Sequence, residues 1–289
     1  MNGFLLIDKP KGVTSANCVY QLRKFLGIKK IGHCGTLDPL ATGLLPICIG
    51  EATKFSSFMS DLDKTYEVDI SFGLETDTGD IEGEIISESI NNFNEIDLKR
   101  VLERFEGPQA QTPPMYSALK NNGKPFYWWA RKGVFLLRKE RNIVIHGIEL
   151  LDFRNNSAKL KVSCTKGTYI RSLAESIGRA LFTKATVISL RRLSVGYIQT
   201  EEMVLMPNEE SRDISSSILP SDFLLKHLPK AILNEEDVKK VRNGQSIYYN
   251  AQLEKEGLVR IYTSKSLFIG IGELNSSKKL SPRRLIAIN

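Results

Sequence analysis

The order of its strand-like and helix-like segments most constrains the fold of this chain. Apolar and polar residues alternate from Tyr66 to Phe72, which predicts a half-buried strand with Tyr66 on its apolar face. Asn142–Phe153 and Ala158–Cys164 resemble an antiparallel pair joined by Arg154–Ser157. Strands outnumber helices and do not alternate regularly with them, as a parallel sheet would require. The sequence therefore predicts an α+β fold with a mixed, largely antiparallel sheet.

Local signals predict where the helices begin and end. Thr14 or Ser15 can cap a helix that runs to Leu26, where Gly27 stops it, and Asn94 can cap a helix that ends at Phe105. The other segments expected in this part of the chain are helices at Glu51–Met59 and Gly167–Leu181, strands at Gly3–Asp8 and Val187–Ile198, a turn-rich loop at Gly73–Asp80, and an irregular connection at Gln109–Lys120.

A polar, serine-rich stretch between Pro207 and Pro220 is the best candidate for a linker. After it we expect a small β-rich module with a helix near Glu235–Val241 and strands at Leu258–Tyr262, Leu267–Ile271 and Arg284–Ile288. The sequence thus predicts two domains, residues 1–225 and residues 226–289.

Positive charge is concentrated in this last module. The chain has 40 Lys and Arg against 33 Asp and Glu, a net charge of +7, and from Lys230 to Asn289 there are 11 basic and 6 acidic residues. A basic terminal module favours a polyanionic partner, most simply nucleic acid. Charge that serves solubility alone is the alternative.

Cellular location and cofactor class are also constrained by the sequence. No apolar run approaches the roughly 20 residues of a membrane span, and the N-terminus has the pattern of a strand, not of a signal peptide. We therefore expect a cytoplasmic protein without a membrane partner.

The four cysteines form no CxxC pair, so we expect reduced thiols and no zinc. No phosphate-binding GxxxxGK[ST] loop is present.

The stretch Ile31–Lys54 is the best candidate for chemistry. It places Asp38 among glycines and prolines, and Pro39 restricts Asp38 to extended geometry. A carboxylate fixed on such a loop suits catalysis, although capping of local turn amides is the simpler explanation for many loop aspartates.

Asp38 would need a cation to keep it ionised and aimed, and Arg171 in Lys166–Arg171 is the candidate. Taken alone, Arg171 also fits a surface arginine on a helix. Tyr66 and Tyr169 have the aromatic rings needed to stack on a base, or they belong to the core.

Two further residues have open roles at this stage. His33 suits insertion into a nucleic-acid fold or an ordinary loop contact with the backbone. Lys9 is placed either to contact phosphate or to end the first strand as a turn residue.

Together these segments resemble the TruB family of tRNA pseudouridine synthases. The matching segments occur in the family's order: Gly3–Pro10, Gly32–Pro46, Gly50–Lys54, Lys64–Val68, Thr76–Asp80, Pro114–Lys120, Lys166–Leu173 and Leu190–Leu193. The Gly32–Pro46 block, with its HxGxLDPxAxGxL pattern, is the most specific of them. The basic tail resembles the small PUA-like RNA-binding domain that follows this catalytic domain.

The resemblance implies a pseudouridine synthase fold with an insertion near residues 75–135. It also implies a monomer that converts uridine 55 in the T loop of tRNA to pseudouridine, without cofactor or metal. The base is flipped out, detached from C1′, rotated and rejoined through C5. The implied roles are catalysis by Asp38, stacking on the uracil by Tyr66, pairing with Asp38 by Arg171, lining of the pocket by Leu190 and Tyr169, filling of the T-loop gap by His33 and support of the site by Lys9.

Two segments depart from the family pattern. Leu181–Val187 lacks the small, glycine-containing turn expected there, and Trp128–Ala130 replaces a more polar pattern in the insertion. The alternatives to a stand-alone enzyme are a guide-RNA-dependent synthase of the dyskerin type, an RNA-folding chaperone that retains the site, and a pure RNA-binding module.

Overall fold

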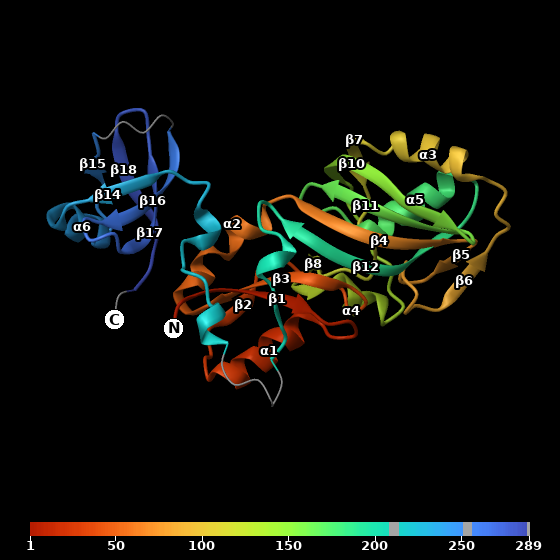
Figure 1. Cartoon of the computed structure of the whole chain (residues 1–289), viewed down its shortest axis with the longest axis horizontal. Coiled ribbons are helices and arrows are strands. Elements are labelled where there is room, and N and C mark those ends of the chain that lie inside the picture. The colour runs from red at the N-terminus through yellow and green to blue at the C-terminus, as the bar shows by residue number, and fades with distance from the viewer. Residues whose placement is uncertain (208–213, 251–255, 288–289) are drawn as a thin grey trace.

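The computed structural model describes residues 1–207, 214–250 and 256–287. Within these residues a nine-stranded sheet extends through most of the molecule, and a five-stranded sheet stands at one end (Figure 1). The strands of the large sheet are β1 (Gly3–Lys9), β2 (Ile31–His33), β3 (Thr42–Ile49), β4 (Lys64–Phe72), β7 (Gly107–Gln111), β10 (Arg141–Arg154), β11 (Ser157–Cys164), β12 (Ala185–Val195) and β13 (Val204–Leu205).

The order of these strands is β13-β1-β3-β12-β4-β11-β10-β7, with β2 beside β3. The pairings of β1 with β13 and of β3 with β12 are parallel, and the other described pairings of this sheet are antiparallel. The predicted α+β class with a mixed, largely antiparallel sheet is confirmed.

Two helices begin at the predicted caps, and the first of them also ends where predicted, whereas the second ends at Glu103 and not at Phe105. The helical segments of this part are α1 (Ser15–Leu26), the 3-10 helix η1 (Gly50–Phe55), α2 (Ser56–Ser60), α3 (Glu95–Glu103), α4 (Phe126–Ala130), α5 (Ile170–Ala180) and the 3-10 turns η2 (Thr200–Glu202), η3 (Ser215–Ser217) and η4 (Phe223–Leu225). The Thr14 hydroxyl accepts the Asn17 N–H, and Gly27 ends α1 in the left-handed conformation. Asn94 forms a capping box with Asp97 at the start of α3.

The C-terminal sheet confirms the predicted β-rich module. It has the order β14-β16-β17-β18-β15, from β14 (Lys230–Leu233), β15 (Ile247–Tyr248), β16 (Gly257–Thr263), β17 (Phe268–Leu274) and β18 (Lys279–Leu285), and α6 (Glu235–Arg242) follows β14. The predicted strand at Arg284–Ile288 is wrong in its bounds, because β18 ends at Leu285 and position 288 lies outside the described residues. The domain boundary at residues 225 and 226 stays a prediction.

Two predicted loops contain strands. β5 (Leu74–Thr76) lies in the loop expected at Gly73–Asp80 and pairs with β6 (Ile85–Glu88). The irregular connection expected from Gln109 begins with the end of β7, which pairs with β10. The helix expected from Gly167 starts at Ile170. Between the two prolines of the predicted linker, positions 208–213 lie outside the described residues, and Leu219 bonds back to Phe4 of β1.

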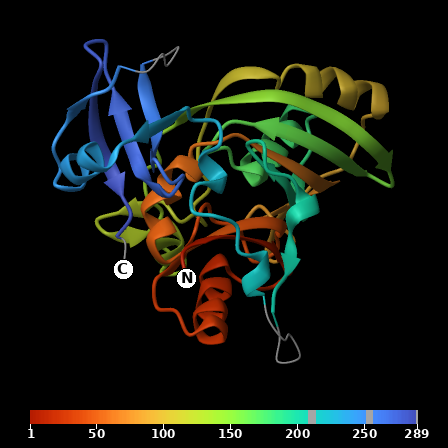
Figure 2. The same ribbon diagram turned by 60° about the vertical axis from the view of Figure 1, so that its left-hand side comes forward.

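The C-terminal sheet is fixed to the segment that follows β3. The rings of Phe55 and Phe268 lie 5.6 Å apart in a hydrophobic cluster that draws on both sheets. Glu51 accepts the N–H of Ala287 at 2.9 Å, and the Lys54 ammonium donates to the carbonyl of Leu285 at 2.7 Å. We call these two bonds the Glu51–Lys54 clasp. In Figure 2 the blue C-terminal sheet stands beside the orange helical turns of this segment.

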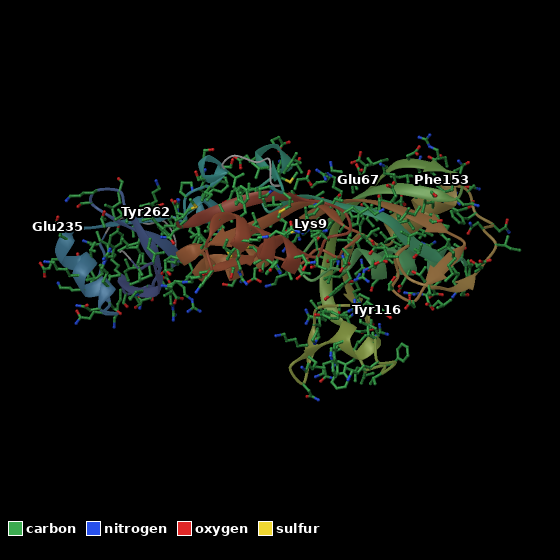
Figure 3. The ribbon with its side chains drawn as sticks, turned by 90° about the horizontal axis from the view of Figure 1, so that it is seen from below. Lys9, Glu67, Tyr116, Phe153, Glu235 and Tyr262 are labelled. Atoms are coloured by element: carbon green, nitrogen blue, oxygen red, sulfur yellow. The ribbon has the colours of Figure 1, made fainter. Side chains whose placement is uncertain are left out.

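A segment that includes α4 stands out from the body of the protein. Figure 3 shows it leaving the body near Tyr116. Two short strands, β8 (Lys120–Asn121) and β9 (Lys124–Pro125), precede α4. Trp128 and Trp129, which replace a more polar family pattern, belong to α4 and therefore lie in this projecting segment. Lys132 lies over the ring of Trp128 at 4.0 Å.

Candidate active site

A cavity of about 400 Å³ opens where several distant segments meet. The loop between β2 and β3 forms one wall, β4 and β12 form its floor, and the start of α5 closes another side. The residues that line it are Gly35–Asp38, Ser60, Lys64, Tyr66, Ser117–Leu119, Thr165, Gly167–Arg171, Leu190 and Arg192. The cavity thus brings together Asp38, Tyr66, Tyr169, Arg171 and Leu190, five of the residues that the sequence singled out.

Hydrogen bonds within the loop, and from the loop to the segment between β1 and α1, fix the main chain around Asp38. The carbonyl of Asp38 accepts the Ala41 N–H at 3.1 Å, and the carbonyl of Pro39 accepts the Gly12 N–H at 2.8 Å. The N–H of Leu37 donates to the hydroxyl of Ser15, which is buried at the start of α1. The main chain is therefore fixed on both sides of Asp38, while its side chain stays 34 % exposed toward the cavity.

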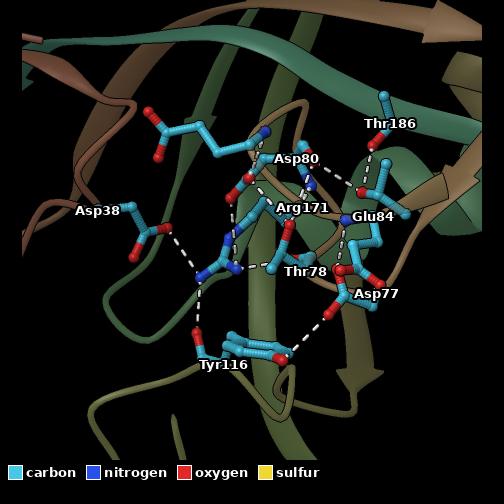
Figure 4. Close-up of polar contacts among 10 residues, drawn as sticks. Asp38, Asp77, Thr78, Asp80, Glu84, Tyr116, Arg171 and Thr186 are labelled. Carbon is cyan, nitrogen blue, oxygen red and sulfur yellow. Dashed lines mark hydrogen bonds and ion pairs between the residues drawn. The ribbon is translucent and has the colours of Figure 1, made fainter. Parts of the chain in front are cut away.

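Arg171 is the partner of Asp38. Its guanidinium is 5 % exposed and lies 2.8 Å from Asp38 Oδ2 and 3.6 Å from Asp80 Oδ2. It also donates to the carbonyls of Thr78 and Tyr116, at 2.7 and 2.8 Å (Figure 4). Arg171 lies in the first turn of α5, which begins at Ile170, and it is one of the buried residues of this helix. The alternative of a surface arginine is wrong.

The electrostatic balance at Asp38 favours a carboxyl group that is harder to ionise than usual. Burial raises the pKa of Asp38 above its ordinary 3.8, and the charge of Asp80 adds to this rise. Arg171 and Lys9 lower the pKa in return. Asp80 itself is fixed by the hydroxyl of Thr78 at 2.9 Å and by the N–H of Glu82 at 3.1 Å.

The three apolar and aromatic candidates lie on elements of the sheet and on the entry to α5. Tyr66 projects from β4, and Leu190, 7 % exposed, projects from β12. Tyr169 precedes α5 and is fixed by Gln111, which accepts its N–H at 2.7 Å and donates to its carbonyl at 3.0 Å. Burial raises the pKa of both phenols, so the rings present neutral faces to the cavity.

Lys9 lies behind the site and not at its surface. Its side chain is fully buried, and the ammonium donates to the carbonyls of Pro10, Val13 and Pro39 at 2.6–3.2 Å. A direct contact with phosphate is therefore wrong for this residue. Its position supports the loop that carries Asp38.

His33 is not among the residues that line the cavity. It is half-buried at the end of β2, and burial together with the charge of Arg192 lowers the pKa of its ring. Within residues 1–207, 214–250 and 256–287, its Nδ1 has no hydrogen-bond partner.

Three further residues belong to the site, and individual sequence signals did not identify them. Asp80 holds Arg171, and Lys64 and Arg192 line the cavity. Each lies in a segment that carries the family resemblance, and this resemblance was the one sequence signal that could have indicated them. Their burial depends on distant strands, so spacing along the sequence could not indicate it.

Side chains that could bind a metal ion are dispersed. Over the described part of the chain, no group of three or more His, Cys, Asp and Glu side chains is placed to hold a metal ion. The helices of that same part include none long and apolar enough to cross a membrane. The four cysteines are buried and unpaired.

Comparisons with known proteins give matches to both parts of the chain. The model of the TruB family pseudouridylate synthase N-terminal domain matches residues 23–170, and that of the pseudouridine synthase II TruB C-terminal domain matches residues 229–286. tRNA pseudouridine synthase B of Chromobacterium violaceum is 44 % identical over 99 % of this chain and 95 % of its own length. Its namesake from Dechloromonas aromatica is 42 % identical over 100 % and 96 %.

Solved structures show the same fold. A Cbf5–Nop10–Gar1 complex contains a chain that matches with a TM-score of 0.73 at 25 % identity, over 99 % of this chain and 84 % of the other. A chain of an H/ACA RNP bound to a substrate RNA containing 2′-deoxyuridine matches with the same TM-score at 24 % identity, over 99 % and 85 %.

Proposed function

Because the chain belongs to the TruB family of pseudouridine synthases, as its sequence predicts, we propose that it converts uridine 55 in the T loop of tRNAs to pseudouridine. Membership makes it an isomerase that turns uridine into pseudouridine, and its relatives over full length are named as tRNA enzymes. The position in the T loop and the roles of single residues are the proposed parts.

The pairing of Asp38 with Arg171 carries the proposal. A carboxylate that takes part in glycosidic exchange must be ionised, oriented and open to the substrate. Arg171 supplies the charge and the orientation at 2.8 Å, and one-third of the Asp38 side chain faces the cavity. Asp38 is thus the proposed catalytic aspartate, whether it adds to the base or acts at the sugar.

Uracil must leave its stacked loop to reach Asp38. Flipping a base costs about a few kcal/mol, and aromatic stacking offsets that cost. A cavity of about 400 Å³ has room for the base, with Tyr66 as the stacking ring and Leu190 and Tyr169 as walls. His33, outside the cavity, is the proposed occupant of the gap that the base leaves, and Lys9 supports the Asp38 loop.

The direct experiment maps pseudouridine in an unmodified tRNA transcript incubated with this protein alone. Modification confined to position 55 is the expected result. Modification that appears only after a guide RNA and partner proteins are added would favour a dyskerin-type synthase instead. Faster tRNA refolding without any modification, unchanged in an Asp38 variant, would favour a chaperone.

The raised pKa of Asp38 predicts the acid limb of the pH profile. Because Asp38 must be ionised, single-turnover activity should fall as pH drops through a midpoint above 3.8. Arg171→Lys keeps a positive charge but loses the two-pronged geometry, so its acid limb should move to higher pH. A midpoint at or below 3.8 in the wild-type protein would contradict this assignment.

The C-terminal sheet predicts a steep dependence of RNA affinity on salt. Lys239, Arg242 and Lys265, together with Glu235, line a groove of about 320 Å³ between α6 and the turn that joins β16 to β17. If the basic side chains contact phosphates, replacing Lys239 and Arg242 by Gln should reduce the slope of log affinity against log salt by about 0.7 for each phosphate that is no longer neutralised. The rate at saturating RNA should not change.

The matched control for the salt experiment is Lys99→Gln on α3, whose side chain is 59 % exposed and pairs only with Glu95 among the described residues. It should leave the slope unchanged. If the RNA affinity of the wild-type protein did not depend on salt, the C-terminal domain would not be a surface that binds the RNA phosphate backbone. We further propose that the chain acts as a monomer in the cytoplasm, with tRNA as its partner.

A further inference from the structure

Among the described residues, Arg192 is a buried cation without a carboxylate partner. Its side chain is 1 % exposed, yet it lines the cavity. Nε donates to the carbonyl of Leu44 at 2.7 Å, and Nη2 lies 3.4 Å from the carbonyl of Gly35. In the described part of the chain, no Asp or Glu forms an ion pair with it, whereas Arg171 has two. A buried charge is costly unless something of opposite sign meets it.

The fold places Arg192 beside the base-binding part of the cavity. Arg192 on β12 lies directly opposite Tyr66 on β4. Opposed residues of an antiparallel pair lie on the same face of the sheet with adjacent side chains. Arg192 therefore stands beside the ring proposed to stack on the uracil, on the sheet floor of the cavity.

Positive charge exceeds negative charge on this floor. Lys64 also lines the cavity, is 8 % exposed, and donates to the carbonyls of Ser60 and Leu62. Burial, followed by the charge of Arg192, lowers the pKa of Lys64 to about 8. Among the described residues that line the cavity, Asp38 is the one carboxylate, and Arg171 pairs with it. A site with this balance favours an anion.

We propose that Arg192 stabilises the negative charge that develops on the uracil when it separates from the sugar. This inference rests on the proposed function. When the C1′–N1 bond breaks, its electron pair stays on the base, and the charge spreads over N1 and the two carbonyl oxygens. A fixed cation in a water-poor site lowers the energy of such a leaving group.

The rest of the exchange conserves atoms and electrons. After the base turns, a pair of electrons at C5 forms the new C1′–C5 bond. C5 then gives up its proton to a base, and N1 takes up one proton, so the product is an isomer of the substrate. Arg192 acts on the base fragment, and Asp38 remains free to act on either fragment.

A phosphate of the RNA is the other anion to consider. The backbone of a flipped nucleotide stays at the mouth of a pocket while the base enters it. Arg192 lines the cavity from the sheet and is 1 % exposed, so it is not at the surface where a phosphate would stay. This position favours the base over the backbone.

The test compares Arg192→Met with Arg192→Lys in single-turnover reactions at saturating RNA. Arg192→Met should lower the rate by about 100-fold, the loss typical of one charge-stabilising group, and leave the RNA Kd within about threefold. Arg192→Lys restores the charge and should recover most of the rate. Arg191→Met, on the same strand with its side chain 36 % exposed and paired to Asp8, is the matched control and should keep the wild-type rate.

A second substrate distinguishes leaving-group stabilisation from a structural role. 5-Fluorouracil is a stronger acid than uracil, so its anion needs less help from Arg192. Because fluorine replaces the hydrogen at C5, the final proton loss cannot occur on RNA that carries 5-fluorouridine at the target position. The quantity compared on both substrates is therefore the single-turnover rate at which the N1-linked nucleoside disappears, and the loss caused by Arg192→Met should shrink to about tenfold on 5-fluorouridine. Equal losses on the two substrates, or a loss that appears in Kd alone, would overturn the inference.

If Arg192→Met does not fold, as its circular dichroism would reveal, Arg192→Gln, which lacks the charge but keeps an N–H donor for the buried carbonyl of Leu44, is compared with the wild type on the two substrates. A smaller loss on 5-fluorouridine supports the inference, and an equal loss overturns it. Failure of the proposed function is a different result: the wild-type protein would then form no pseudouridine at position 55.

Discussion

Replacement of Asp38 by Asn should abolish pseudouridine formation while leaving RNA affinity nearly unchanged. We expect the rate to fall by at least about 10⁴-fold, or about 5.5 kcal/mol in activation free energy, because an amide provides no negative charge. Asn has nearly the same size as Asp, and Arg171 keeps Asp80 and two carbonyls as partners. The measurement is single-turnover release of tritium from C5 of uridine in a T stem-loop.

The control for this variant is Asp152→Asn, an exposed position on β10 whose carboxylate pairs with Arg154. It should keep wild-type turnover. Asp38→Asn with turnover near that of the wild type would remove Asp38 from the chemistry. A large loss of RNA affinity in the same variant would show that Asp38 serves binding and not the reaction.

Replacement of Arg171 by Gln should reduce both activity and stability. The change leaves Asp38 and Asp80 close together without the cation between them. Breaking a buried ion pair in this way typically costs about 3–5 kcal/mol, so the midpoint of urea unfolding should fall markedly. The rate should drop by at least about 10³-fold, because Asp38 loses its orientation and becomes harder to ionise.

A second substitution separates the two effects of Arg171→Gln. Adding Asp80→Asn removes one of the two unpaired charges and should restore part of the stability without restoring the rate. Arg179→Gln, on α5 with its side chain 61 % exposed, is the matched control and should change neither. Recovery of activity in the double variant would mean that Arg171 is needed for folding only.

Local signals in the sequence were enough to predict the features that depend on neighbouring residues. Thr14 and Gly27 specify the ends of α1, and the alternation from Tyr66 to Phe72 specifies β4. The specific block around Asp38 indicated the site, and the order of matching segments indicated the family. For α1 and β4 the physical cause lies within a few residues of the signal.

The features that sequence reasoning missed depend on contacts between distant segments. β5 exists because β6 pairs with it, and β7 because β10 does. Lys9 was open to a phosphate role because its three carbonyl partners, one of them at Pro39, come together only on folding. Arg192 is adjacent in sequence to Arg191, yet one is buried at the cavity and the other reaches Asp8 near the surface.

The Glu51–Lys54 clasp has a consequence for which RNAs the protein accepts. The same short segment that follows β3 bonds to Leu285, the last residue of β18, and to Ala287 just beyond it, and Phe55 packs against Phe268 of the C-terminal sheet. The separation between the cavity and the basic groove beside α6 is therefore a fixed length. An RNA that contacts both must present its uridine at that one distance. We therefore expect the three-dimensional outline of the RNA to contribute to substrate choice.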